Sequence, residues 1–443
     1  RCQMSNARRV AASVLGAALL VAPSASADPL TGPLIRPARS RPAFPRSHPA
    51  LCSQLRPVCV HAPDSRTAPS LQPFLADLES AAVRVGSVLQ WPAPLPDARR
   101  GGSSDFDVFL EPLQQSAVAV DPDLPLDTDF FDRTSAFARV DPRLTGCMRR
   151  SALAEAYARA GLFAIDAAAD HAIAAASAAY VASIAEACDG AFLAAIDDYQ
   201  AQPWAAVSRQ DIAGGRGAML LPWFMQARHG IPETVDLLHA LWVNGMQRTT
   251  PGSWRWNNEP DFIDVLRSFQ KDRGESFGEL LLEYAIARAF VGDRDDGIHL
   301  DATGWMGASG RVRFESRFPW SSLPQWIRPT RPIEPTGGIY LWIDLKDVPK
   351  DASLGFRAEW DDPAVFRFAL LRLGPDGQEI GKLAPMTPER SSSVEANLEH
   401  LEGAVAILVV GVNAGALAGE FRFDPDEIPP EPAGCMITLA AQR

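Results

Sequence analysis

The spacing of hydrophobic residues changes twice along the chain. Residues 71–89 place Leu, Phe and Val at three- and four-residue spacing, which predicts a helix. Alternating polar and apolar residues then predict half-buried strands at 105–110 and 136–140. A run of helical patterns follows, in which alanine, the strongest helix former, dominates the first two members. These helices are expected at residues 151–162, 171–187, 214–230, 233–243, 259–271 and 277–291.

Beyond residue 297 the hydrophobic period becomes that of strands. Short strands separated by Pro, Gly and Asp turns predict an antiparallel β-sandwich. The fold class is therefore α+β, with a mostly helical domain and a few short strands before the sandwich. The strands are expected at residues 312–318, 338–345, 354–360, 365–373, 391–398, 405–412, 420–423 and 436–440.

The first residues predict export from the cytoplasm. Arg8 and Arg9 precede an apolar run at residues 10–21, and Ala25-Ser26-Ala27 supplies the small residues of a cleavage site. The run is shorter than the roughly 20 residues needed to span a bilayer, and no later stretch is long enough. We therefore expect a signal peptide at 1–27, a secreted or periplasmic protein, and no membrane span after cleavage.

The length of the chain predicts the number of folded units, and its net charge bears on which macromolecules it can bind. A chain of 443 residues exceeds the roughly 250–300 at which single cores stop growing, so two folded units are expected. Residues 28–102, rich in Pro and Arg, are expected to form a leader arm and the first helix, 103–295 the helical domain, and 296–443 the sandwich. The formal net charge of −12 disfavours nucleic acid as a partner.

The cysteines fit a compartment that permits disulfides. Cys52 and Cys59 lie close together in a proline-rich segment and are the easiest pair. Cys147 and Cys188 stand at opposite ends of a helical stretch and could join its two ends. Cys435 is left over and is interpreted as a buried strand residue.

Two glycine-containing motifs carry no chemistry of their own. The sequence Gly-Gly-Arg-Gly at 214–217 lacks the Lys-Ser or Lys-Thr of a phosphate loop and predicts only the start of a helix. Residues 293–297 resemble the opening of a calcium loop, but Gly304 occupies the position that requires a bidentate Glu. A linker between domains is the better interpretation.

The order of motifs resembles a family of secreted bacterial zinc metalloproteases with a zincin-like helical core. It comprises Cys52, then Cys59-Val60-His61, a helix, Asp-Phe-Asp-Val-Phe-Leu at 105–110, the helical core and a sandwich that closes near residues 423–432. In that family the first core helix carries His-Glu-x-x-His, and a second helix supplies a Glu as the third zinc ligand.

The resemblance implies that the zinc ligands are lost. The two histidine positions are Ala154 and Ala158, and the third ligand aligns with Ala175. Only Glu155, the general base in the family, remains, and one carboxylate cannot hold or activate zinc. We therefore expect a catalytically inactive homologue with a binding or scaffolding role, no cofactor, and an unidentified protein or peptide as its ligand.

Two other functions stay open. The chain could be an active peptidase with relocated ligands, such as Glu155 with His171, and would then need zinc. It could also be an extracellular adhesive or structural protein in which the sandwich is the working part. A possible binding loop combines aromatic and amide side chains between Gly and Pro, as sugar- and peptide-binding surfaces do: Trp254, Trp256, Asn257 and Asn258.

Overall fold

The computed structural model describes most of the chain after the predicted signal peptide. The described residues are 34–35, 40–45, 47–114, 116–123, 130–188, 190–209, 213–248, 255–256, 260–300, 302–349, 351–361, 364–387, 391–416 and 432–442. The expected signal peptide at 1–27 and the expected strand at 420–423 lie outside these ranges, as do Trp254, Asn257 and Asn258.

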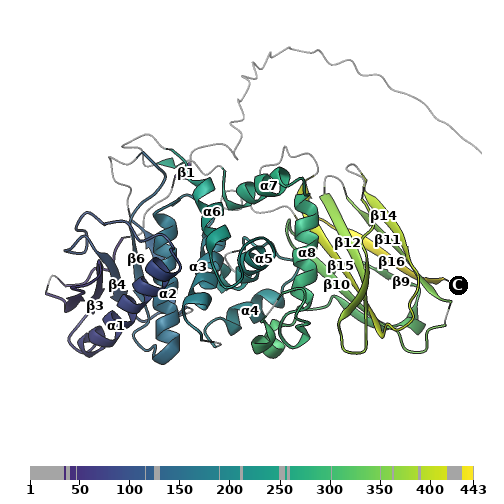
Figure 1. Cartoon of the computed structure of the whole chain (residues 1–443), viewed down its shortest axis with the longest axis horizontal. Coiled ribbons are helices and arrows are strands. Elements are labelled where there is room, and N and C mark those ends of the chain that lie inside the picture. The colour runs from purple at the N-terminus through teal and green to yellow at the C-terminus, as the bar shows by residue number, and fades with distance from the viewer. Residues whose placement is uncertain are drawn as a thin grey trace, which may run out of the picture.

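A five-stranded sheet forms the N-terminal end of the molecule (Figure 1). Its inner strands run parallel and its two edge strands are antiparallel to their neighbours. The boundary that we expected near residue 102 therefore falls between two neighbouring strands of one sheet. The order is β2 (Ala50–Cys52), β3 (Val58–His61), β4 (Phe106–Leu110), β6 (Ala136–Val140) and β5 (Val118–Pro122).

The central strand β4 is more deeply buried than the sequence predicted. Alternation predicted a half-buried strand, but all its residues, including Asp107, are buried. The prediction was wrong because β4 has parallel neighbours on both sides and is covered on both faces, as parallel strands usually are. A buried carboxylate needs partners, and Asp107 has them.

Helices pack on this sheet and then on one another. α1 (Leu71–Ala81) continues into a wider π-helical turn at Ala82–Val88, and both α1 and α2 (Gly146–Phe163) pack against the strands. α3 (His171–Ala185) begins at Asp170, whose carboxylate accepts from the backbone N–H groups of Ala172 and Ile173. The remaining helices are α4 (Leu193–Gln200), α5 (Leu220–His229), α6 (Asp236–Gly245), α7 (Phe262–Asp272) and α8 (Phe277–Ala289).

Two further sheets make up the C-terminal end (Figure 1). One has the order β13 (Glu379–Leu383), β12 (Ala364–Leu373), β15 (Ala406–Ala416), β10 (Gly338–Asp344) and β8 (Ser316–Pro319). The other has the order β14 (Ser393–Leu398), β11 (Ser353–Trp360), β16 (Cys435–Gln442) and β9 (Gln325–Ile327).

Aromatic and aliphatic residues from both C-terminal sheets form one hydrophobic core. Phe356 of β11 contacts Phe368 of β12 with ring centroids 5.3 Å apart, and Ile437 of β16 joins the same cluster. Pairing is antiparallel except between β8 and β10, which are parallel, so the expectation of a wholly antiparallel arrangement is corrected there. Cys435 is a buried free thiol at the start of β16, as expected.

Helix α8 joins the helical part to the C-terminal sheets. Leu281 and Ile286 of α8 share a core with Leu371 of β12 and Val410 of β15. The Tyr340 hydroxyl of β10 donates to the backbone carbonyl of residue 285, at 2.8 Å. Figure 1 shows α8 lying between the other helices and the sheet.

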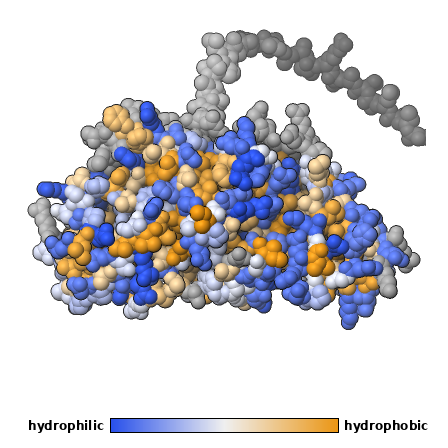
Figure 2. Space-filling view, viewed as in Figure 1, coloured by the Kyte–Doolittle hydropathy of each residue, from blue (hydrophilic) through white to orange (hydrophobic). Residues whose placement is uncertain are grey.

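The hydropathy of the visible surface differs between the two ends of the molecule. In Figure 2 hydrophobic residues form patches over the helical part and the N-terminal sheet, whereas hydrophilic residues prevail over the C-terminal sheets. None of the described helices is both long and apolar enough to cross a membrane. The disulfides Cys52–Cys59 and Cys147–Cys188 are both formed, as expected, which fits an oxidising compartment.

His299 ties the segment after α8 to the sheet edge. Its ring stacks on Phe290 with centroids 4.1 Å apart, and its nitrogens lie 2.8 Å from an Asp296 carboxylate oxygen and 3.0 Å from one of Glu379. Burial alone lowers the pKa of His299, but the hydrogen bonds and charges of the two carboxylates outweigh burial and raise it to about 9. The protonated ring therefore stabilises the fold.

This ion pair predicts a loss of stability at alkaline pH. Because the folded pKa lies above the ordinary value of 6.5, the contribution of His299 is complete below pH 6.5 and disappears as pH rises through 9. We expect the free energy of unfolding to fall by on the order of 2 kcal/mol across that window. Denaturant unfolding at several pH values measures the fall, and His299→Gln should remove most of it. An equally steep fall in the variant would contradict the assignment.

Candidate functional site

The expected zinc position lies between α2 and α3 and contains no imidazole. Ala154, Ala158 and Ala175 are all fully buried, and the two helices pack against each other. Methyl groups let the helix axes approach closely, since the distance between packed helices depends on the side chains at the contact. Alanine thus offers no ligand atom at any of the three positions.

Glu155 is closed off within this packing. Its side chain is 2% exposed, and one carboxylate oxygen accepts from Arg216 Nη2 at 2.7 Å. The Arg216 guanidinium also lies 5.2 Å from the ring centroid of Phe192, which supplies a cation–π contact. A buried carboxylate held by the partly exposed Arg216 is an ion-pair partner and is not free to act as a base.

The glycines beside Arg216 explain how it reaches Glu155. Arg216 lies in a 3₁₀ turn at Ala213–Met219 that packs against α3 and α4. A Cβ at Gly217 would stand 2.1 Å from the backbone oxygen of Ala195, and one at Gly215, whose φ is +84°, would meet the backbone of Ala172. The motif that sequence analysis interpreted only as a helix start therefore brings a guanidinium into the core.

A second arginine adds positive charge to the same place. Arg159 lies one helical turn after Glu155, and burial lowers its pKa, although Glu155 raises it in part. Its Nη2 is 3.4 Å from Nδ1 of His171. His171 therefore faces a guanidinium, and within the described residues no group of three His, Cys, Asp or Glu side chains that could hold a metal includes Glu155 or His171.

This arrangement does not fit zinc. A zinc site needs three or four donor atoms, and Ala154, Ala158 and Ala175 offer none. Two guanidinium groups, those of Arg159 and Arg216, would also repel a divalent cation placed beside Glu155. The charge of Glu155 is already balanced, so the position has nothing left with which to bind a metal ion.

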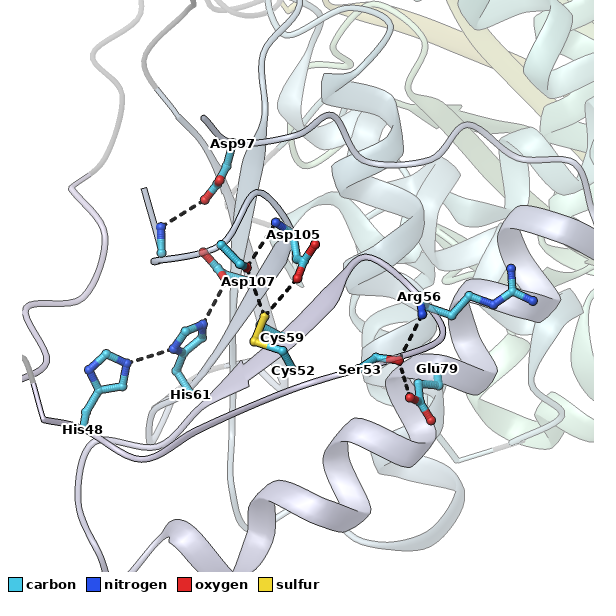
Figure 3. Close-up of a disulfide and its surroundings, with 12 residues drawn as sticks. His48, Cys52, Ser53, Arg56, Cys59, His61, Glu79, Asp97, Asp105 and Asp107 are labelled. Atoms are coloured by element: carbon cyan, nitrogen blue, oxygen red, sulfur yellow. Dashed lines mark hydrogen bonds and ion pairs between the residues drawn. A yellow bond between two sulfur atoms is a disulfide. The ribbon is translucent and has the colours of Figure 1, made fainter. Parts of the chain in front are cut away.

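A different polar cluster fixes the N-terminal arm to the first sheet, and Figure 3 shows its members Asp97, Asp107 and His61. Arg41 pairs with three buried carboxylates, with 2.7 Å to Asp97 and 2.7 Å to Asp123, and also with Asp107. Burial opposes the charge on Arg41, but Asp123, Asp107 and Asp97 raise its pKa. The pKa of Asp97 is also raised, by burial first and by Asp107, while Arg41 acts in the opposite direction.

Two histidines extend this cluster toward the surface. His48 Nδ1 lies 2.7 Å from the carbonyl oxygen of Pro45, and His61 Nε2 lies 2.8 Å from Asp107, so both nitrogens donate. His48 Nε2 in turn lies 2.8 Å from His61 Nδ1, so a chain of contacts leads from Pro45 through both rings to Asp107 (Figure 3).

The same cluster is not a metal site. Cys59, His61 and Asp107 lie within reach of one another, and so do Cys52, Cys59 and Asp105. Both sulfur atoms, however, belong to the Cys52–Cys59 disulfide and are not available as thiolates. Arg41 already occupies the other oxygen of Asp107, so we assign this cluster a structural role.

A groove of about 520 Å³ opens at the C-terminal end of α3. Its wall includes Phe192, whose ring makes the cation–π contact with Arg216. Arg216 therefore contacts both the buried carboxylate of Glu155 and a residue of the groove wall. The lining combines aromatic rings and carboxylates with small and aliphatic side chains, contributed by α3, α5 and the segments near 187–192, 232–233 and 302–305. The aromatic and acidic members are Tyr180, Phe192, Trp223, Trp305, Glu186 and Glu233.

Glu186 is the unusual member of the groove wall. It ends α3 and is 3% exposed, and one of its oxygens accepts from Arg150 at 3.1 Å and lies 3.5 Å from Arg84. The other oxygen, Oε1, is buried and has no hydrogen-bond partner. An unsatisfied buried acceptor costs about 1–3 kcal/mol, so it calls for an explanation.

Sequence analysis did not find the groove. Its residues lie far apart along the chain, and none belongs to a motif. The only signal was Cys188, whose disulfide with Cys147 anchors the segment that follows Glu186. The expected binding loop at residues 254–258 is described only for the backbone of Arg255–Trp256, which pairs as β7 with β1 (Leu34–Ile35).

No protein-family model and no curated protein matches the chain. One similar solved structure is the pre-peptidase C-terminal domain of a collagenase from Bacillus anthracis, with 10% identity over 30% of this chain and 99% of that domain, and a TM-score of 0.19. Another is a xylan-binding domain of Xyn10C from Paenibacillus barcinonensis, with 12% identity over 27% and 71% of the two chains and a TM-score of 0.17. Similarities this weak support no conclusion about fold or function.

The Glu155–Arg216 pair predicts strong coupling between two substitutions. Arg216→Met leaves the buried carboxylate of Glu155 without its guanidinium partner and should lower the free energy of unfolding by about 3 kcal/mol, and Glu155→Leu, which leaves the partly exposed Arg216 unpaired, should cost less. The double variant should lose less than the sum, because the interaction between the two side chains is lost only once. Denaturant unfolding measures all three. Arg357→Met, which breaks an exposed pair with Glu359, should change little, and additive losses at the buried pair would contradict the assignment.

The two disulfides predict unequal contributions to stability. Cys147 and Cys188 are 41 residues apart, whereas Cys52 and Cys59 are 7 apart. The longer loop loses more entropy in the unfolded chain on closure, so replacing Cys147 and Cys188 with Ala should cost about 3–4 kcal/mol. Replacing Cys52 and Cys59 should cost less. Thermal unfolding compares the two variants, and a reversed order would contradict this account.

Proposed function

We propose that this chain is a secreted, catalytically inactive relative of zincin-like metalloproteases that acts by binding. The observation that carries the proposal is the buried ion pair of Glu155 with Arg216, set among alanines at the ligand positions. A general base of a metalloprotease must face a metal-bound water. Here the only remaining member of the catalytic set faces a guanidinium.

Further support for a binding role comes from the groove, which is the accessible surface near Glu155. The position between α2 and α3 is filled, while the groove at the end of α3 is open and lined by aromatic rings and carboxylates. Concave surfaces of this size and composition are the usual places for ligands. We place the binding role in this groove and propose that the two C-terminal sheets form a β-sandwich that supports the helical part through α8.

The alternatives gain less support. A peptidase with relocated ligands would use Glu155 with His171, but Arg216 and Arg159 face these two residues. An adhesive or structural protein that works through its C-terminal sheets stays a prediction, since no feature of those sheets points to a particular partner.

Metal analysis tests the proposal. The purified secreted protein, incubated with zinc and then gel-filtered, should hold far less than one zinc per chain, because alanines and guanidinium groups cannot ligate it. It should also fail to cleave unstructured protein substrates, with or without a chelator. Elemental analysis and a casein digestion assay give the two readouts. About one tightly held zinc, or hydrolysis that a chelator abolishes, would refute the proposal.

A further inference from the structure

Metal-ligating side chains gather on one face of the N-terminal sheet, on neighbouring strands (Figure 3). Cys59 of β3 lies opposite Cys52 of β2 on one side and opposite Asp107 of β4 on the other. Asp105 stands two positions before Asp107 and reaches the same face, because side chains alternate along a strand. The donor atoms of Cys52, Cys59 and Asp105 all lie within 4.8 Å of one another. Their spacing suits a single metal ion, but the disulfide withholds both sulfurs.

The Asp105 carboxylate faces a sulfur that cannot satisfy it. Its Oδ2 lies 3.4 Å from Cys59 Sγ, and the Ser103 hydroxyl lies 3.2 Å from the same sulfur (Figure 3). A disulfide sulfur carries no proton, so it cannot donate to the carboxylate. In the part of the chain that the structure describes, no arginine or lysine pairs with Asp105, which is half-buried. A thiol proton or a metal ion between Cys59 and Asp105 would supply the partner that the disulfide lacks.

The disulfide can be opened without dismantling the sheet. Cys52 is half-buried in the three-residue edge strand β2, and the exposed residues 54–57 follow it, so a reductant can approach this sulfur. The bond joins residues only 7 apart, and breaking a short loop costs little stability. Strand β3 is buried along its whole length and pairs with β4 at every position. The donor side chains therefore keep their places when the bond is broken.

Reduction converts the two sulfurs into ligands. The thiolate of an external thiol attacks Cys52 Sγ, and Cys59 leaves as a thiolate. A second external thiol then attacks the mixed disulfide and releases Cys52, so the reductant departs as its own disulfide with the two electrons accounted for. A zinc ion that binds the pair displaces the two thiol protons.

We propose that the reduced Cys52–Cys59 pair binds one zinc ion through both sulfurs and a carboxylate oxygen of Asp105, with water in the fourth position. Zinc takes sulfur and carboxylate ligands together in a tetrahedral arrangement, whereas calcium and magnesium require oxygen ligands. Nearby, three carboxylates meet the single guanidinium of Arg41, so the negative charge of this region favours a cation. Zinc binding then depends on the redox state of one disulfide. The site is independent of the binding function proposed for the groove.

Zinc uptake by the full-length protein tests the proposal. One sample is reduced with a phosphine, which adds no thiol that competes for zinc, and the other keeps its disulfides. Alkylation followed by mass spectrometry verifies that Cys52 and Cys59 are free in the reduced sample. After incubation with zinc and gel filtration, we expect about one zinc per chain in the reduced protein and far less in the disulfide form.

Two further readouts identify the ligands as thiolates. Zinc binding to the reduced protein should release about two protons per ion. Cobalt in place of zinc should give the charge-transfer absorption of a cobalt–thiolate bond in tetrahedral geometry. Equal zinc content in the two forms, no zinc in the reduced form, or cobalt binding without thiolate absorption would overturn the proposal.

Variants locate the ion. Replacing Cys52 and Cys59 together with Ala should abolish uptake by the reduced protein, and Asp105→Asn, which keeps the shape of the side chain, should weaken zinc roughly tenfold or more. Asp376→Asn removes an exposed carboxylate from a turn of the C-terminal sheets and should leave the affinity unchanged. If the double variant fails to fold, Cys52→Ser at the edge strand takes its place and should also weaken zinc roughly tenfold or more. Unchanged affinity in the folded site variants would overturn the proposal.

The outcomes separate this site from the proposed function. Tightly held zinc and chelator-sensitive cleavage in the disulfide form would refute the inactive-protease proposal and leave the reduced site to its own test. An inactive protein whose reduced form takes up no zinc would refute the Cys52–Cys59 site alone.

Discussion

The close packing of α2 against α3 through alanine side chains is the constraint on which the helical part depends. Helices that meet through methyl groups leave no room for imidazole rings or for water. A carboxylate in such a contact must be neutralised from a neighbouring element, and Arg216 does this for Glu155. The small side chains of α2 and α3 and the ion pair of Glu155 with Arg216 are therefore two parts of one packing arrangement.

The protein buries charge in two different ways. Around Glu155 one carboxylate pairs with Arg216, and Arg159 lies nearby among apolar helices. Around Arg41 three carboxylates meet one guanidinium, and His61 contacts one of the three, Asp107. The first arrangement neutralises a carboxylate within the helical core. The second attaches the N-terminal arm to β3 and β4.

Periodicity predicted most of the regular elements because most helices and strands are amphipathic or bounded by turn residues. The strand at 136–140 and the helix that begins at residue 277 are confirmed, and so are the four cysteines that pair. Strands β2, β3 and β5 and helix α4 were not predicted, because they are short and lie beside turns. β2 and β3 pair with each other and β5 pairs with β6, so these strands are stabilised by the sheet and not by a strong pattern of their own.

The candidate site was harder to predict than the fold. The resemblance pointed to Ala154, Ala158 and Ala175, but the role of Arg216 could not be predicted, because it depends on a glycine turn meeting the backbones of α3 and α4. The same holds for Glu186. Its unpaired oxygen results from two arginines approaching one side of the carboxylate, which no spacing along the chain encodes.

Helix α8 belongs to two hydrophobic cores at once. Leu280 and Tyr284 face the helical part, while Leu281 and Ile286 face the C-terminal sheets. If the chain were cut near residue 296, one fragment would expose the hydrophobic face of α8 to water. The other fragment would expose the hydrophobic face of the C-terminal sheet that α8 covers. The two ends of this molecule are distinct in architecture, yet α8 packs on both and residues 203–209 bond to residues 334–338, so a change that loosens either end will be felt at the other.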